Sequence, residues 1–296
     1  FDIMRTCILD SKIDTLSPSI MKAMVQYYIK ENESEELEQL ICLLDIRQLD
    51  VALTLSLCEE FHLNEIITYV WTVLLNDYIT PMIKVVKRIR ELEEQRLQLN
   101  HDELEVLEAD IDYIYPYISY VLTGRQFPSE RTIPDELGRA AKLNIYYVLF
   151  NGSAIEWPVG SGVIHTVSDH NDEPAFPYLT QLLKYNSESM LACINEAFED
   201  EFLNDTEKAA SSIGEDEHHL AVNRQYIMDV LLGVYNDHDS ALSILDKIRF
   251  AVFVSRNYPK YYQFIRVADS LADEMIDLLC KAGCMYCDKS IDICVT

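Results

Sequence analysis

Apolar residues recur at intervals of three and four along almost the whole chain. Leu37, Leu40, Ile41 and Leu44 show this pattern over two helical turns, and residues 67–74 repeat it with Ile, Val, Trp and Leu. This period places apolar side chains on one face of an α-helix. No segment shows a convincing strand pattern, so the sequence predicts an all-α protein.

Two helices are expected to meet near residue 100. Thr80 and Pro81 indicate a helix start, because threonine is a common N-cap and proline is favoured at the first helical position. We expect this helix to run to about Leu99, with a polar, solvated second half, and the next helix to begin near His101.

The motif YPYISYVLTGRQFP lies at the end of that second helix. An apolar stripe continues from Leu104 to Val121 with Pro116 inside it. Proline lacks a backbone donor, so it should kink this helix or end it early. Gly124 stands where glycine commonly reverses the chain after a helix, and Pro128 follows where a helix cannot resume.

The second half of the chain is expected to hold more helices, separated by two long loops. Segment 152–172 is rich in glycine and polar residues, and segment 205–219 has the composition of a disordered connector, so both are predicted to be long mobile loops. The remaining helices are expected at Ile133–Gly152, Pro174–Tyr185, Ser187–Leu203, Ala221–Tyr235, Ser240–Asn257 and Lys260–Cys280.

These patterns add up to about ten to twelve helices, each with one apolar stripe, joined by mostly short links. Helices of this kind bury their stripes by stacking in a row. We therefore predict one irregular α-solenoid of stacked helical hairpins, of the clathrin-heavy-chain-repeat type, over residues 1–296. An all-α globule is the alternative packing.

Composition agrees with a helical fold and excludes several functions. Eight glycines and nine prolines are few for 296 residues, whereas sandwiches, barrels and nucleotide-binding α/β folds need more turn glycines. The net charge of −26 repels nucleic-acid phosphates and anionic lipid. Basic protein partners suit such a surface.

The eight cysteines show no spacing typical of a secreted disulfide framework, which favours a reducing, cytosolic compartment. No apolar run reaches the roughly 18 residues of a membrane span. No signal peptide opens the chain, and the helical pattern starts almost at once. We expect a segment of a longer protein.

Two glycine motifs resemble phosphate loops only superficially. Gly124-Arg125 follows a helix, where carbonyl groups point outward, whereas a phosphate loop needs glycines before a helix N-terminus. Gly160-Ser161-Gly162 lacks the flanking strand and the lysine of a nucleotide motif. We interpret the first as a helix cap and the second as loop flexibility.

The metal candidates are histidines and a cysteine cluster. His165, His170 and His218-His219 do not form the His-Glu-x-x-His pattern of a helical zinc site, so they are interpreted as exposed loop residues. The stronger candidate has four thiols that could bind zinc, although its first three continue an amphipathic helix: Cys280, Cys284, Cys287 and Cys294. Buried thiols near a helix end are the simpler interpretation.

Two charge clusters complete the candidates. The basic one is interpreted as a solvated helix face balanced by neighbouring glutamates, or alternatively as a site for an acidic partner: Lys84, Lys87, Arg88 and Arg90. The acidic one is interpreted as a surface helix face: Glu196, Glu199, Asp200 and Glu201. We therefore predict no catalytic, cofactor-binding or metal-binding residues.

Four stretches, taken in order, resemble the vacuolar protein sorting-associated protein 8 family. They are YVWTVLLNDYITP (69–81), YISYVLTGRQFP (117–128), FPYLTQLLKYNSESMLACINEAFED (176–200) and VNRQYIMDVLL (222–232). The resemblance covers about residues 37–232 and extends less securely to 280. Each stretch alone is modest, but four in sequence are fairly specific.

The resemblance implies an α-solenoid that lies between a β-propeller and a RING-type zinc domain, both outside this chain. It implies a large, non-catalytic subunit of the endosomal tethering complex CORVET. Its implied partners are the class C core subunits, other CORVET subunits and, through a region absent here, an early-endosomal Rab GTPase. Such a protein would be cytosolic and peripheral on the cytoplasmic face of endosomes.

The expected function is therefore geometric: a helical arm that helps vesicles dock before SNARE-mediated fusion, in endosome-to-vacuole or lysosome protein sorting. A related HOPS or coat-type solenoid subunit is the nearest alternative. An all-α metal-dependent hydrolase that uses the Cys280 cluster or the loop histidines is a distant one.

Overall fold

The computed structural model describes residues 1–96, 101–152, 155, 174–204, 222–236, 242–243, 245–247, 249–250 and 253. These residues are predominantly helical, and the one β-bridge among them pairs Arg125 with Thr132. The predicted all-α class is confirmed. The chain forms two compact units, Phe1–Ile145 and Tyr146–Thr296.

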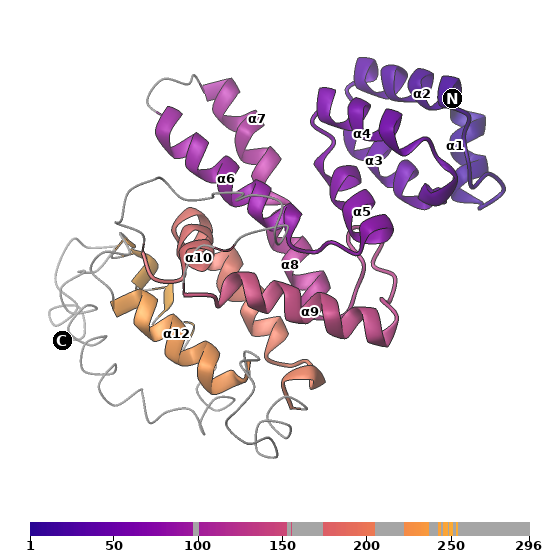
Figure 1. The fold of residues 1–296 in the computed structure, drawn as a ribbon. Coiled ribbons are helices and arrows are strands. Elements are labelled where there is room, and N and C mark those ends of the chain that lie inside the picture. The colour runs from indigo at the N-terminus through magenta and orange to yellow at the C-terminus, as the bar shows by residue number, and fades with distance from the viewer. Residues whose placement is uncertain are drawn as a thin grey trace, which may run out of the picture. The chain divides into compact units, whose positions relative to one another are not determined.

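The first unit contains most of the described helices (Figure 1). A 3₁₀ turn, η1 (Ile46–Gln48), lies between the third and the fourth. The helices are α1 (Asp2–Leu9), α2 (Pro18–Glu31), α3 (Ser34–Leu43), α4 (Val51–Glu60), α5 (Asn64–Leu75), α6 (Thr80–Gln95), α7 (His101–Asp112) and α8 (Ile114–Leu122).

Alternate helices stack on one another in this unit. Helix α1 packs on α3 and α3 on α5, while α2 packs on both α3 and α4. Helix α4 packs on α5, and the series continues from α5 to α6 and from α6 to α7. From α1 to α5 each helix contacts its next-but-one neighbour, which is the arrangement of a helical repeat.

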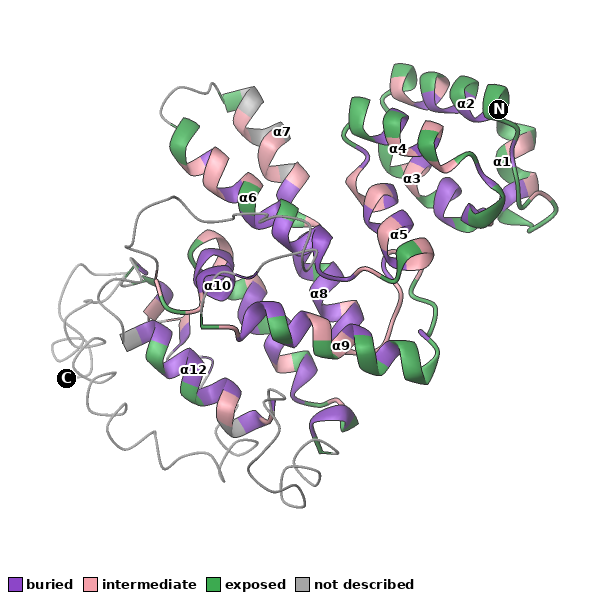
Figure 2. Ribbon diagram, in the orientation of Figure 1, coloured by how far each residue is buried: buried purple, intermediate pink, exposed green. Residues whose placement is uncertain are grey.

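The first predicted stripe forms part of the core. Leu37, Leu40 and Ile41 are at most 1% exposed, and the buried and exposed faces of the helices are separated in Figure 2. The second stripe is rotated from its predicted position. Ile66 and Val70 are buried in α5, whereas Trp71 remains half-buried.

The rotation of α5 has a simple cause. This helix carries apolar residues on more than one side, so its sequence permits two choices of buried face. Packing against α3 and α4 selects the face that contains Ile66, Tyr69 and Val70. The other apolar side is left to line a groove.

The helix that the sequence predicts across Pro116 is interrupted, and the break lies a few residues before the proline. Helix α7 ends at Asp112 and α8 begins at Ile114, so Pro116 is the third residue of α8. An uninterrupted helix would require a hydrogen bond from residue 116 to the carbonyl of Asp112. Proline cannot donate it and its ring crowds that carbonyl, which explains why α7 stops there.

The end of α8 is the glycine cap that the sequence predicts. Gly124 has a φ of +77°, its N–H donates to the Val121 carbonyl at 3.0 Å, and Arg125 N–H donates to the Tyr120 carbonyl at 2.7 Å. These two bonds define a Schellman motif. The chain then returns to α9 (Asp135–Leu149), whose first turn holds Asp135 and Glu136.

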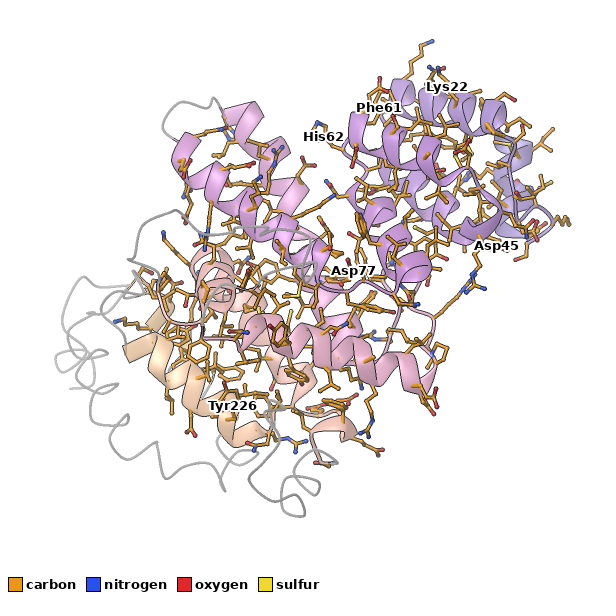
Figure 3. The ribbon with its side chains drawn as sticks, viewed as in Figure 1. Lys22, Asp45, Phe61, His62, Asp77 and Tyr226 are labelled. Carbon is orange, nitrogen blue, oxygen red and sulfur yellow. The ribbon has the colours of Figure 1, made fainter. Side chains whose placement is uncertain are left out.

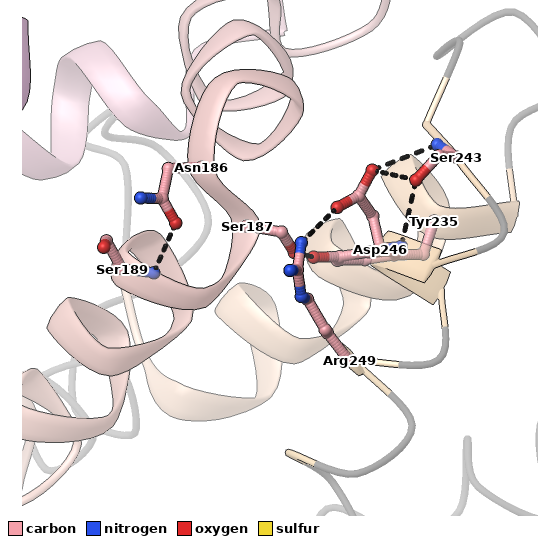
Figure 4. A network of polar contacts seen from close by, with 7 residues as sticks. All are labelled: Asn186, Ser187, Ser189, Tyr235, Ser243, Asp246 and Arg249. Atoms are coloured by element: carbon pink, nitrogen blue, oxygen red, sulfur yellow. Dashed lines mark hydrogen bonds and ion pairs between the residues drawn. The ribbon is translucent and has the colours of Figure 1, made fainter. Parts of the chain in front are cut away.

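The second unit is built around α10 (Pro177–Ala197) and α12 (Arg224–Asn236). Asn186 has non-helical φ and ψ, so α10 consists of two helical parts, as the sequence predicts. The Asn186 side chain accepts the Ser189 N–H at 3.0 Å and thereby caps the second part (Figure 4). Nearby, the hydroxyls of Ser187 and Tyr235 lie 2.7 Å apart and join α10 to α12.

Several predicted features lie wholly or mostly outside the described residues. They are the loops 152–172 and 205–219, the helix 260–280 and most of the helix 240–257, of which residues 245–247, 249–250 and 253 are helical. That residues 1–296 form a single solenoid segment also stays a prediction. Three of the four described cysteines are buried free thiols, namely Cys42, Cys58 and Cys193.

The cap at Gly124 can be tested against a helical glycine. A Cβ at Gly124 would meet only the Lys142 side chain, at 3.7 Å, so the cost of Gly124→Ala is conformational. We expect a loss of about 1 kcal/mol in unfolding free energy. Exposed Gly233 lies within α12 with open space around it, so Gly233→Ala should stabilise by about 0.5–1 kcal/mol.

Urea unfolding of the two variants and the unmodified chain measures both changes. A neutral or stabilising Gly124→Ala substitution would contradict the left-handed cap. The opposite signs expected at the two glycines exclude a general effect of adding a methyl group.

Candidate functional site

A groove of about 300 Å³ opens in the first unit between α5 and α6, and we call it the α5–α6 groove. His62, just beyond α4, and Asp110, in the C-terminal part of α7, also line it. In Figure 3, His62 projects from the chain just beyond α4. The lining residues are Glu59, His62, Asn64, Ile67, Thr68, Trp71, Pro81, Lys84, Val85, Lys87, Arg88, Glu91, Asp110 and Tyr113.

Helix α6 supplies the cations of the groove because of its start and its period. The Asp77 side chain accepts the N–H groups of Ile79 and Thr80, both at 2.9 Å, so Asp77 provides the cap that the sequence assigned to Thr80. Helical spacing then brings Lys84, Lys87 and Arg88 to one side. Val86 and Ile89 are fully buried on the other side.

Trp71 of α5 lines the groove and lies beside a cation of α6. The Lys84 ammonium lies 5.2 Å from the centroid of its ring, within the range of a cation–π interaction. Helix α5 presents Trp71 because Ile66 and Val70 occupy its buried face. The indole therefore offers an apolar surface and fixes the position of a cation.

The rim is a charged cluster centred on Asp110, whose side chain is only 12% exposed. His62 Nδ1 lies 3.2 Å and Arg88 Nη2 lies 3.7 Å from its Oδ2 atom, and the Asn64 amide donates to Oδ1 at 2.9 Å. Burial raises the pKa of Asp110, and His62 and Arg88 oppose that rise. Arg88 Nη1 also lies 3.5 Å from Oε2 of Glu91, so this α6 residue approaches two carboxylates of the groove.

A second carboxylate, that of Glu38, lies close enough to Asp110 for the two charges to interact. Glu38 accepts the Glu65 N–H at 3.1 Å in the first turn of α5, where helix N–H groups lack intrahelical partners. Burial first, and then the charge of Glu65, raise the pKa of Glu38 to about 8, although the backbone hydrogen bonds lower it. Burial also raises the pKa of Tyr113 to about 12.

The groove combines apolar and charged side chains that could contact a ligand. Within the described part of the chain, no group of three or more His, Cys, Asp or Glu residues is placed to hold a metal ion. The lining of the groove combines an apolar floor with three permanent cations and three carboxylates, of which Asp110 and Glu91 are approached by Arg88. Such a surface can bind a ligand with apolar and anionic groups.

The basic cluster predicted from the sequence is partly confirmed as a balanced helix face. Arg88 pairs with Glu91, as expected, but it also approaches Asp110, and Lys84 lies over Trp71. Three of the four predicted cations line the groove; Arg90 does not. Sequence reasoning missed the partners of these cations, since nothing local links α6 to His62 or Asp110.

The other predicted candidates have different outcomes. Gly124-Arg125 is the helix cap described above. The acidic cluster lies at the end of α10, which stops at Ala197, so Glu199 and Asp200 are beyond this helix and not on its face. There Asp200 Oδ1 accepts the Phe202 N–H at 2.9 Å, and buried Arg224 donates to the Phe198 carbonyl. The remaining candidates lie outside the described residues: Gly160, Ser161, Gly162, His165, His170, His218, His219, Cys280, Cys284, Cys287 and Cys294.

Comparison with known proteins gives a consistent result. A family model described as Vps8 central TPR matches residues 1–198. The chain is 30% identical over 284 residues to vacuolar protein sorting-associated protein 8 of Saccharomyces cerevisiae, covering 95% of this chain and 22% of the yeast protein. The Mus musculus homolog is 26% identical over 280 residues, covering 95% and 17%, respectively.

The Homo sapiens homolog is 25% identical over 280 residues, with the same two coverages of 95% and 17%. The chain therefore spans less than a quarter of the length of these curated relatives. None of the described helices has the length and apolar character needed to cross a membrane.

Glu38 yields a prediction about pH. Its pKa rises from 4.5 to about 8 on folding, so the folded chain retains a proton that the unfolded chain releases. The stability that this proton provides is present below pH 4.5 and is lost as pH rises through 8. Glu38→Gln cannot ionise and keeps an oxygen to accept the Glu65 N–H.

We expect the stability of Glu38→Gln relative to the unmodified chain to increase by roughly 1–3 kcal/mol between pH 5 and pH 8. Urea unfolding at the two pH values measures this difference. Exposed Glu94 on α6 is the matched control, and Glu94→Gln should show little change with pH. If the difference in unfolding free energy between Glu38→Gln and the unmodified chain did not change with pH, the raised pKa of Glu38 would be contradicted.

Proposed function

The chain belongs to the Vps8 family, and from this premise we propose that it is a non-catalytic scaffold segment of the endosomal tethering complex CORVET. In this proposal it acts in vacuolar protein sorting, during Rab-dependent vesicle docking before SNARE-mediated fusion. The observation that carries the proposal is the match of residues 1–198 to the Vps8 central TPR region.

The packing of the first unit supports a scaffold role. Alternate helices stack on one another from α1 to α5, and helices such as α2 and α3 bury one face and leave another exposed to solvent. Helical-repeat proteins use such exposed faces to bind other proteins. A segment of this kind acts by holding partners at fixed positions and needs no reacting groups.

The proposed partners are the class C core subunits and other CORVET subunits. The early-endosomal Rab GTPase would bind a part of the family that lies outside this chain. Association with the cytoplasmic face of endosomes would then depend on partners. The negative charge of the chain agrees with this, because it disfavours direct binding to anionic lipid.

Cross-linking in cells tests the assignment. A photo-reactive amino acid is placed at exposed Gln39 in α3 or exposed Lys22 in α2 of the full-length protein. We expect adducts with class C core subunits or with CORVET-specific subunits. The same amino acid at fully buried Leu40 should give adducts only within the chain.

Recovery of HOPS-specific subunits without CORVET-specific ones would instead assign the segment to the HOPS complex. Adducts that contain no tethering subunit at any exposed position would overturn the proposal. The buried position shows whether an adduct requires an accessible surface.

Metal analysis tests the enzymatic alternative. The compact spacing of Cys280, Cys284 and Cys287 within a predicted helix differs from the two separated knuckles of a structural zinc site. We expect the purified chain to hold no stoichiometric zinc after dialysis, as measured by plasma mass spectrometry. One zinc per chain that is lost in Cys284→Ser would contradict this expectation.

A further inference from the structure

We propose that the α5–α6 groove binds a short acidic segment of a partner protein, in which a carboxylate lies next to an apolar or aromatic anchor. The proposal goes beyond the tethering assignment, because it requires only the fold of the first unit. It would hold for this surface whichever complex contains the chain.

The floor of the groove provides the site for the anchor. Ile67 and Trp71 of α5 are half-buried, and Pro81 and Val85 of α6 are buried. An aliphatic or aromatic side chain placed against Trp71 would remove further apolar surface from water, which is the main source of affinity in such pockets. The 300 Å³ of the groove suits a few side chains and not a folded domain.

Two lysines provide the site for the carboxylate. Lys84 is held over Trp71, directly beside the floor, and Lys87 lies one turn further along α6. Among the described residues, no carboxylate lies within ion-pair distance of either ammonium group. A partner carboxylate next to the anchor would therefore meet two cations that no described carboxylate already pairs with.

The acidic lining residues do not cancel this preference. Asp110 is approached by His62 and Arg88, and Glu91 is approached by Arg88. Glu59 is exposed at the rim and has no cationic partner within the described residues. Across the groove lining, the three carboxylates Glu59, Glu91 and Asp110 therefore do not outnumber the three permanent cations, in a chain whose net charge is −26.

The same charges favour a short peptide over a polyanion. The field of the whole chain repels nucleic acid and anionic membranes, since both carry many charges over a long distance. One or two carboxylates interact mainly with cations within the screening length of about 8 Å at physiological salt. A short segment can thus use Lys84 and Lys87 without approaching the rest of the acidic surface.

Selection from a random peptide library provides the test. Phage-displayed dodecapeptides are selected on the purified 296-residue chain and counter-selected on the double variant Lys84→Glu/Lys87→Glu. We expect the recovered peptides to place Asp or Glu beside Phe, Trp, Leu or Ile. Synthetic forms of these peptides should bind the double variant at least roughly tenfold more weakly than the unmodified chain.

Lys22→Glu is the matched control, because Lys22 is an exposed lysine on α2 outside the groove (Figure 3). It should leave the affinity for the peptides within about twofold, and far-ultraviolet circular dichroism should show that all variants remain folded. Trp71→Leu keeps an apolar side chain but loses the cation–π contact. It should weaken binding and abolish the change in tryptophan fluorescence that the peptides cause.

Three outcomes would overturn the proposal. The first is a library that yields no peptide able to distinguish the chain from its double variant, or that yields basic peptides. The second is an equal loss of affinity in Lys22→Glu, which would indicate general electrostatics. The third is tighter binding to a single-stranded oligonucleotide or to phosphatidylserine vesicles, with the same dependence on Lys84 and Lys87.

Discussion

The structure of the first unit depends on one constraint: a helix with a single apolar stripe must bury that stripe against its neighbours. Leu37, Leu40 and Ile41 of α3 do so between α1, α2 and α5. Because consecutive helices share these contacts, each one is stable only while those on either side of it are in place. The groove of this unit lies where the stack continues from α5 to α6.

The stack leaves one helix with more apolar surface than it can bury. Packing of α5 against α3 and α4 uses Ile66 and Val70, so Ile67 and Trp71 face a second direction. Helix α6 covers that surface only in part, since its own buried face is filled by Val86 and Ile89. The α5–α6 groove is therefore a result of the same packing that makes the array, and a scaffold of this type can acquire a binding surface without a dedicated loop.

Charge has two separate roles in this protein. Over the whole chain the excess of acids sets a repulsive field toward polyanions. Within the first unit a few carboxylates are drawn into the structure, where Glu38 meets the start of α5 and Asp110 joins α7 to the residues after α4. These groups contact the backbone around the groove, while Lys84 and Lys87 of α6 form no ion pair with a described carboxylate.

The sequence by itself determined the helices and several of their ends. The three-to-four period predicted α3 and α5, Thr80-Pro81 predicted the start of α6, Pro116 predicted an interruption, and Gly124 predicted a glycine cap. Each of these effects arises within a few residues of backbone. The fold class followed from these local signals. The basic residues of α6 were also visible as a cluster, although not their surroundings.

Only the tertiary structure decided the candidate site. Two adjacent isoleucines in α5 satisfy the same period, so the choice of Ile66 over Ile67 for the core depended on α3 and α4. The contact of Asn64 with Asp110 joins residues 46 positions apart, and no local pattern predicts it. Period and caps act over one or two turns, whereas the groove depends on how α5, α6 and the end of α7 pack on one another.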